Sequence, residues 1–186
     1  PGLSQGYHAM TFAWLVGEII RRIDGRMPGD YFKEEIAEPF NLDFHIGLSE
    51  NNIHRCADVG YKRLDNLNPQ LGFIKFIPNI FLNKDLKNLK ETFISGDFKK
   101  AFKSDRLDKD GPNSLDWRTA QIPAANGHGT AQSLAKLFGI LSTGCQRDNI
   151  KILDTDTLTN STKIHSSGPD TVLFGTKLNF GYCFML

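Results

Sequence analysis

Tyr7 is the residue near the start of the chain whose side chain is best suited to chemistry. A phenol has an ordinary pKa of about 10, so it accepts a proton near neutral pH only when neighbouring ammonium groups favour the phenolate or when it shares a proton network. A helical pattern begins a few residues later, and a helix would hold the ring rigidly, as proton transfer requires. Two interpretations stay open for Tyr7: a catalytic proton-transfer group, or a structural tyrosine beside a helix.

Ser133 and Lys136 form a literal Ser-x-x-Lys pair. On a helix this spacing places a hydroxyl and an ammonium group on one face, where the lysine can activate the serine as a nucleophile. Ser133 is expected beside the apolar stripe of its helix and not on it, whereas a nucleophilic serine belongs at a buried helix start. We therefore interpret Ser133 as non-catalytic.

A glycine-rich stretch, Asn126-Gly127-His128-Gly129, precedes the same helix. Its two glycines would let the backbone approach a ligand closely, and amides before a helix start can bind anions. The alternative is a simple loop that enters a helix. The stretch lacks the Gly-Lys-Ser/Thr of a phosphate loop, so it does not predict nucleotide binding. Together with His8, the neighbour of Tyr7, we take Asn126, Gly127 and His128 as candidates for lining a substrate cleft.

The five histidines show no metal-ligand spacing with each other or with the cysteines, so we predict no metal site. The three cysteines, Cys56, Cys145 and Cys183, are odd in number and widely spaced. That pattern argues against a disulfide framework and favours an intracellular, reducing compartment without fixing one.

The composition is that of an ordinary globular chain. Its 186 residues are 40% hydrophobic and include 14 Phe, which suffices for one packed domain. A formal net charge of +1 provides no global field for nucleic acid. No stretch reaches the run of about 18 apolar residues that predicts a membrane span.

The helix expected after Tyr7 must position the phenol. Thr11 is the predicted cap and Gly25 the left-handed stop. Gly17 in mid-helix predicts close packing at that point, since glycine otherwise weakens a helix. The predicted buried stripe recurs at helical spacing and consists of Phe12, Val16, Ile19, Ile20 and Ile23.

Further elements follow from the same signals. We expect a second helix capped by Asp30 and ended by Pro39, and another capped by Thr130 with Leu134, Leu137, Phe138 and Leu141 on one side. A further helix is predicted by the apolar residues Leu82, Leu86, Leu89 and Phe93, which recur at helical spacing. Its opposite face has three lysines: Lys84, Lys87 and Lys90. This basic face is interpreted as a solvated surface or, alternatively, as a surface for an anionic partner or a membrane. The remaining expectations are strands at 44–48, 53–59, 172–174 and 179–186, a helix at 154–163, and loops at 60–68 and 105–114.

Three blocks of sequence resemble one family. The first contains Pro1-Gly2, Gly6-Tyr7-His8-Ala9, the helix Thr11 to Arg22 and the stretch Ile36 to Leu48. The second is Ile122 to Phe138, and the third is Gly168-Pro169-Asp170 with Phe180 to Leu186. In this order they resemble the serine hydrolases related to class C β-lactamases, penicillin-binding proteins and β-lactamase-like esterases. The resemblance covers most of the chain apart from about residues 64–114, and it is specific as a whole although no single block is.

The resemblance implies roles for particular residues. In this family a serine of Ser-x-x-Lys attacks a carbonyl, a tyrosine of Tyr-x-Asn assists proton transfer, and a Lys/His-Thr/Gly-Gly strand helps to bind the acyl group. Only the tyrosine carries over, onto Tyr7, and Ala9 stands where the family has Asn. We expect the nucleophile motif before Pro1 and the final motif beyond Leu186, which makes residues 1–186 a partial domain, internal to or truncated from such an enzyme.

The resemblance also implies an α+β, β-lactamase/transpeptidase-like fold, of which this chain supplies mainly the helical region and a few antiparallel strands. The implied reaction is acyl transfer from a small-molecule ester or amide to serine, followed by hydrolysis, without a metal or organic cofactor. We expect no hydrolysis by these residues alone. The alternative is a non-catalytic relative that binds a partner. The oligomeric state stays open.

Overall fold

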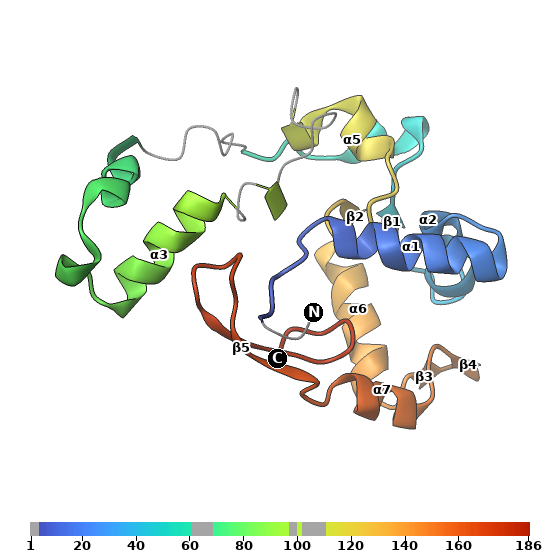
Figure 1. The fold of residues 1–186 in the computed structure, drawn as a ribbon. Coiled ribbons are helices and arrows are strands. Elements are labelled where there is room, and N and C mark those ends of the chain that lie inside the picture. Colours follow the sequence, from blue (N-terminus) through green and yellow to red (C-terminus); the bar gives the residue numbers. More distant parts are fainter. Residues whose placement is uncertain (1–3, 61–68, 97–99, 102–110) are drawn as a thin grey trace.

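The computed structural model describes residues 4–60, 69–96, 100–101 and 111–186. In this part of the chain helices dominate, and the strands form three separate two-stranded antiparallel pairs (Figure 1). The described helices include none long and apolar enough to cross a bilayer. The arrangement is α+β, as predicted.

Helix α1 (Thr11–Asp24) follows Tyr7, as predicted. Its cap residue is Met10, so Thr11 is already helical and the predicted Thr11 cap is wrong by one residue. The Thr11 hydroxyl instead hydrogen-bonds with Nδ1 of His8 at 2.9 Å. Gly25 ends the helix in the left-handed conformation, with φ 91°, and donates its N–H to the carbonyl of Arg21, as the sequence predicts.

The buried side of α1 differs from the predicted stripe. Ala13 and Gly17 are the buried residues of the helix, whereas Ile19 is 56% exposed and Ile23 82%. The helix packs through its small residues: a Cβ on Gly17 would lie 2.8 Å from Cγ of Pro28. The close packing expected at Gly17 is therefore confirmed. The stripe prediction is wrong because periodicity identifies a helix but not the face that meets a neighbour.

Helix α2 (Pro28–Phe32) continues into the π-helical turn η1 (Lys33–Ala37). Pro28 is the first helical residue, where a missing N–H costs nothing, so the predicted Asp30 cap is wrong. The helix ends at Ala37, ahead of Pro39, as predicted.

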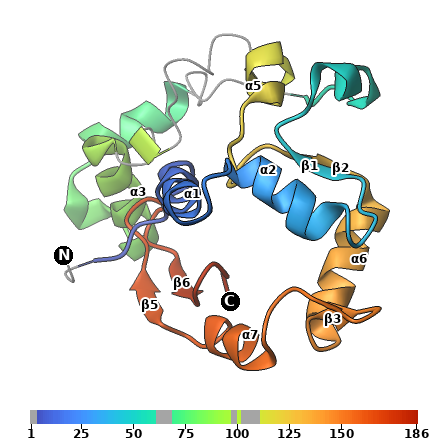
Figure 2. The same cartoon turned by 90° about the vertical axis from the view of Figure 1, so that its right-hand side faces the viewer.

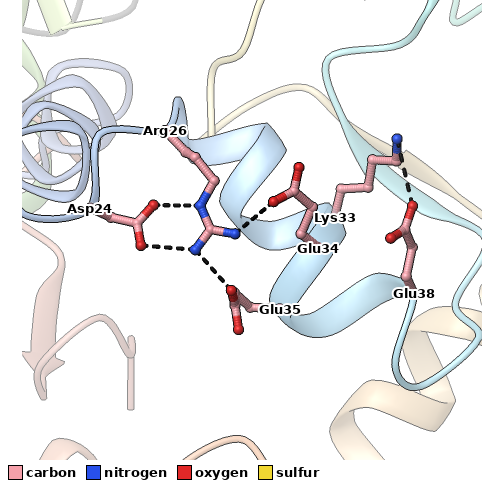
Figure 3. A network of polar contacts seen from close by, with 6 residues as sticks. All are labelled: Asp24, Arg26, Lys33, Glu34, Glu35 and Glu38. Carbon is pink, nitrogen blue, oxygen red and sulfur yellow. Dashed lines mark hydrogen bonds and ion pairs between the residues drawn. The ribbon is translucent and has the colours of Figure 1, made fainter.

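Arg26 connects the end of α1 to the second helix (Figure 3). Its guanidinium donates to Asp24 and, at 2.7 Å and 2.8 Å, to Glu34 and Glu35, and it lies 5.0 Å from the ring centre of Tyr31. Glu34 and Glu35, in the turn η1, thus converge on one cation. Single exposed pairs stabilise little, but one guanidinium shared by three carboxylates fixes the direction of the turn.

Strand β1 (Phe44–Ile46) pairs with β2 (Gly127–Gly129), and His45 lies opposite His128. The strand at β1 is as predicted, but the simple loop considered for residues 126–129 is in part this short partner strand. Its glycines make room for the ring of Phe44, which lies 2.7 Å from the place of a Cβ on Gly127. A larger side chain there would displace the ring.

The other helices show where sequence signals succeed. Asn83 caps α3 (Lys84–Ser95), Thr130 caps α6 (Ala131–Ser142), and Asp154 precedes α7 (Thr155–Ser161), so these three predicted helices are confirmed.

The strand predicted at 53–59 is wrong: its first residues belong to a 3-10 helix, and Cys56 to Gly60 form no strand. The remaining helical turns are η2 (Glu50–Arg55), η4 (Pro69–Phe76), η5 (Asn79–Phe81), η6 (Gly111–Asn113) and α5 (Leu115–Thr119). Most of the loops predicted at 60–68 and 105–114 lies outside the described residues.

The C-terminal strands are β5 (Ser166–Pro169) and β6 (Lys177–Phe180), after the small pair β3 (Gln146–Arg147) and β4 (Ile150–Lys151). The strand predicted at 172–174 is wrong. Oδ1 of buried Asp170 accepts the N–H groups of Val172 and Leu173 and turns the chain there. The strand predicted at 179–186 is correct only for its first two residues.

Two small apolar clusters form the core. One joins η1 to α6 through Ala37, Phe40, Leu42 and Ile140. The other comprises Ala9, Met10 and Ile122, with Tyr7 and Trp117 packed against it. Of the apolar side predicted for α6, Leu134 and Phe138 are exposed, because the helix turns Ile140 and Ser133 inward instead.

Two glycine substitutions test the packing of α1. Gly17→Ala is expected to lower the free energy of unfolding by about 1–2 kcal/mol, because the clash with Pro28 outweighs the gain in helix propensity. Gly139→Ala in α6, where nothing lies within 4 Å of a Cβ, is expected to raise it by about 0.5–1 kcal/mol. Urea denaturation measures both. Equal stabilisation by the two substitutions would show that α1 does not rest on Pro28.

Candidate active site

Tyr7 lies half-buried in the wall of a cavity of about 720 Å³. Its ring stacks on that of Phe180, with centroids 6.3 Å apart and planes within 9°. The cavity is mostly apolar, and no Lys or Arg is among the described residues that line it. Besides Tyr7 the larger side chains of the lining are His8, Phe12, Val16, Phe180, Phe184 and Met185.

The segment that leads into Tyr7 is held by the C-terminal strands. Nε2 of Gln5 donates to the carbonyls of Gly168 and Leu178 at 2.7 Å and 3.1 Å, and the carbonyl of Gln5 accepts the N–H of Thr171 at 3.0 Å. Figure 2 shows this segment beside β5 and β6. The cavity wall is therefore built from both ends of the described chain.

His8 lines the same cavity as Tyr7. Its ring is exposed, and its hydrogen bond to Thr11 in the first turn of α1 fixes its direction. Of the four candidate cleft residues, it is the one that the structure brings together with Tyr7.

Asn126 has an interior position. It is 2% exposed, its amide donates to the carbonyls of Trp117 and Ala120, and its Oδ1 accepts the N–H of Ile122 at 2.9 Å. These bonds fold the loop between Trp117 and β2, so the side chain is used within the protein. Pro123 and Ala124, from the same sequence block, reach the cavity beside Tyr7 instead.

Gly127 and His128 line a second cavity of about 390 Å³, which shares no lining residue with the first. Asp43, His45 and Arg55 also line it. The Asp43 carboxyl has a pKa below its ordinary value, mainly because of its hydrogen bond with the Arg55 guanidinium and, to a smaller extent, because of its hydrogen bond with His45. The structure therefore separates these two candidates from Tyr7.

Ser133 is buried, and its hydroxyl is occupied. The Oγ atom accepts the backbone N–H of Asp43 at 2.8 Å and the hydroxyl of Thr130 at 3.0 Å. The expectation that Ser133 lies beside the buried face of its helix is wrong, because it lies on that face. Its hydrogen bonds join α6 to the start of β1, which agrees with a structural role.

Ser166 and Cys183 also line the cavity beside Tyr7, and sequence reasoning missed both. The Ser166 hydroxyl donates to Oε1 of Gln5 at 2.5 Å, which commits it to holding the N-terminal segment. Cys56, Cys145 and Cys183 are free cysteines. Among the described residues no group of three His, Cys, Asp or Glu side chains is placed to hold a metal ion.

Asn126→Ala tests whether this side chain serves the fold. Removing a buried amide that bonds to three backbone groups is expected to lower the free energy of unfolding by about 3 kcal/mol, because the N–H of buried Ile122 and the carbonyls of half-buried Trp117 and Ala120 lose their partner. Asn160→Ala, on the exposed surface of α7, serves as the control and should change stability by less than about 0.5 kcal/mol. Equal effects in urea denaturation would contradict the interior role.

His128 should make stability depend on pH. Burial lowers its pKa below the ordinary value of 6.5, and among the described residues its Nδ1 has no hydrogen-bond partner. The unfolded chain then binds the proton more readily than the folded one, so this contribution is present above about pH 6.5 and is lost as pH falls through the lowered pKa.

His128→Gln should consequently reduce the loss of urea resistance between about pH 7.5 and pH 5.5. The exposed His54 provides the control, and His54→Gln should leave that loss unchanged. A His128→Gln variant with the same pH profile as the original chain would refute the assignment.

Comparison with known proteins places this geometry in context. The family model for Beta-lactamase matches residues 1–186. The esterase/beta-lactamase LipL of Mycobacterium tuberculosis (strain ATCC 25618 / H37Rv) is 30% identical over 158 residues, which are 84% of this chain and 34% of LipL. This chain thus spans about a third of that curated relative.

Solved structures agree with the fold. A penicillin-binding protein homolog from Caulobacter crescentus has a TM-score of 0.72 and 31% identity, and the match covers 99% of this chain and 43% of that one. A family VIII carboxylesterase has a TM-score of 0.70 and 25% identity, with 100% and 43% covered. The predicted β-lactamase/transpeptidase-like fold is confirmed, and the chain belongs to the family of β-lactamase-related serine hydrolases.

Proposed function

We propose that this chain forms one side of the active site of a serine hydrolase that transfers the acyl group of a small-molecule ester or amide to a serine and then hydrolyses the acyl-enzyme. The observation that carries the proposal is the position of Tyr7 in the wall of a cavity of about 720 Å³, and the sequence resemblance supports it by matching Tyr7 to the family's tyrosine. Aliphatic and aromatic side chains around that cavity suit an apolar acyl group.

In the proposed mechanism Tyr7 takes the proton of the attacking serine hydroxyl and returns it to the leaving group. Phe180, stacked on the phenol, and the buried pair Ala9 and Met10 hold the ring in place. The described residues that line the cavity include no Lys or Arg. The serine and its lysine are proposed to come from polypeptide other than these residues, because only the tyrosine of the family's motifs carries over onto this chain. This chain alone is therefore expected to give no turnover.

Tyr7→Phe in the complete product of the gene tests the proton-transfer role. With p-nitrophenyl butyrate as substrate, kcat should fall by about 10²–10⁴-fold with little change in KM, because general acid–base catalysis is lost while the cavity keeps its shape. Tyr182→Phe is the matched control, since Tyr182 stacks on His165 at 3.8 Å and does not line the cavity. It should retain full activity.

Other outcomes would change the conclusion. Undiminished kcat in Tyr7→Phe would remove the role proposed for the phenol. Turnover by the 186-residue chain that Ser133→Ala abolishes would identify Ser133 as the nucleophile. A complete gene product that does not hydrolyse esters, amides or β-lactams would favour a non-catalytic relative that binds a partner.

A further inference from the structure

A second surface feature lies at the edge of the molecule, on the segment that precedes α3 (Figure 1). Four large apolar side chains of this segment face solvent, and we call them the apolar patch: Phe73 (71% exposed), Phe76 (82%), Ile80 (85%) and Phe81 (77%). Scattered exposed hydrophobic residues are ordinary, but four within nine positions indicate a surface that contacts something else.

The apolar patch belongs to folded structure. Ile74, between Phe73 and Phe76, and Leu82, directly after Phe81, are buried and anchor the segment. Nζ of Lys90 in α3 donates to the carbonyl of Ile77 at 2.7 Å and to Oδ1 of Asn79 at 3.0 Å, which ties the segment to the helix. The exposed rings are thus held outward by hydrogen bonds and buried neighbours.

Basic residues accompany the patch. From Phe73 to Lys87 the chain has three lysines and one aspartate, a net charge of +2, besides Lys90, whose ammonium group is bound to the segment itself. Lys75 stands between two of the exposed rings in sequence, and Lys84 follows the patch; both are exposed. A partner that binds this surface should therefore have an apolar interior covered by a layer of negative charge.

The exposed side of α1 offers a contrast. Leu15, Ile19 and Ile23 are also solvent-facing. Their charged neighbours, Glu18, Arg21, Arg22 and Asp24, are two acids and two bases, so the net charge there is zero. Exposure alone does not distinguish the two surfaces, but charge does.

We propose that the apolar patch and its lysines dock on the surface of an anionic lipid bilayer. Phenylalanine and isoleucine side chains at the tip of a rigid segment enter the boundary between headgroups and acyl chains, and the lysines meet the lipid phosphates. This is binding on a membrane and not through it, and it does not depend on the proposed hydrolase activity.

Vesicle flotation of the complete gene product tests the proposal. Binding is expected to phosphatidylcholine vesicles that contain about 30% phosphatidylserine, and to weaken at least about tenfold in pure phosphatidylcholine or in about 0.5 M NaCl, since salt screens surface charge. Equal binding to neutral vesicles, or none to either kind, would overturn it.

Variants locate the binding surface. The double substitution Phe76→Ser with Ile80→Ser should abolish flotation, and Lys75→Glu with Lys84→Glu should remove the preference for anionic vesicles. Leu15→Ser with Ile19→Ser on α1 is the control, because it removes two other exposed apolar side chains from a surface of zero net charge. Loss of flotation in this control alone would place the contact on α1 and overturn the assignment.

Two further measurements separate other occupants of the patch. In thermal denaturation, the variant Phe76→Ser with Ile80→Ser is compared with the original protein. A Tm lower by several degrees would mean that another part of the complete protein covers the patch. Sedimentation equilibrium that shows a dimer dissociated by the same substitutions would mean that a second copy covers it. Either result overturns the proposal, whereas an unchanged Tm and an unchanged mass with lost flotation support it.

Discussion

The amide side chain of Gln5 is the interaction on which the candidate site depends. Its Nε2 donates to carbonyls of β5 and β6 that are 163 and 173 residues away in the chain, and its Oε1 accepts a hydrogen bond from the Ser166 hydroxyl. Because Tyr7 follows two residues later, the position of the phenol is set by strands at the other end of the sequence. The stack of Tyr7 on Phe180 and the shared cavity wall are consequences of this attachment.

The two cavities on either side of the Ile122 to Gly129 loop have different chemistry. Beside Tyr7 the described lining is mostly apolar and includes no lysine or arginine, which suits an acyl group in the proposed reaction. Beside His128 the described lining includes charged side chains, and Arg55 and His45 share the carboxylate of Asp43. Asn126 separates them, since its buried amide fixes the loop from which Pro123 faces one cavity and Gly127 the other.

Local signals in the sequence were sufficient where local chemistry decides the structure. Gly25 ends α1 and Thr130 caps α6 because each needs only its neighbours within one turn. The exposed stripe of α1 and the turn at residues 172–174 could not be predicted, because the first depends on Pro28 and the second on the buried carboxylate of Asp170.

The candidate site divides in the same way. Tyr7 and His8 are neighbours in sequence and line the same cavity. Asn126 and His128 were predicted to join them, but Asn126 is in the interior and His128 lines the other cavity. The pairing of Gln5 with distant strands brings three further residues to the cavity: Phe180, Ser166 and Cys183. The periodicity of the sequence does not predict such long-range pairing. The proton-transfer role of Tyr7 stays a prediction.

The packing of Phe44 against β2 has an evolutionary consequence. The ring occupies the space that side chains at positions 127 and 129 would need, so these three positions cannot vary independently. At Gly127 the nearest atoms all belong to the Phe44 ring, whereas at Gly129 backbone atoms of Asp43 and Phe44 also fill the space. A lineage that acquires a bulkier residue at position 127 must therefore also acquire a smaller one in place of Phe44, or lose the antiparallel register that sets the two imidazoles opposite each other. A smaller residue 44 would not make room at position 129, so compensating exchanges between residues 44 and 127 are the variation that this small sheet permits.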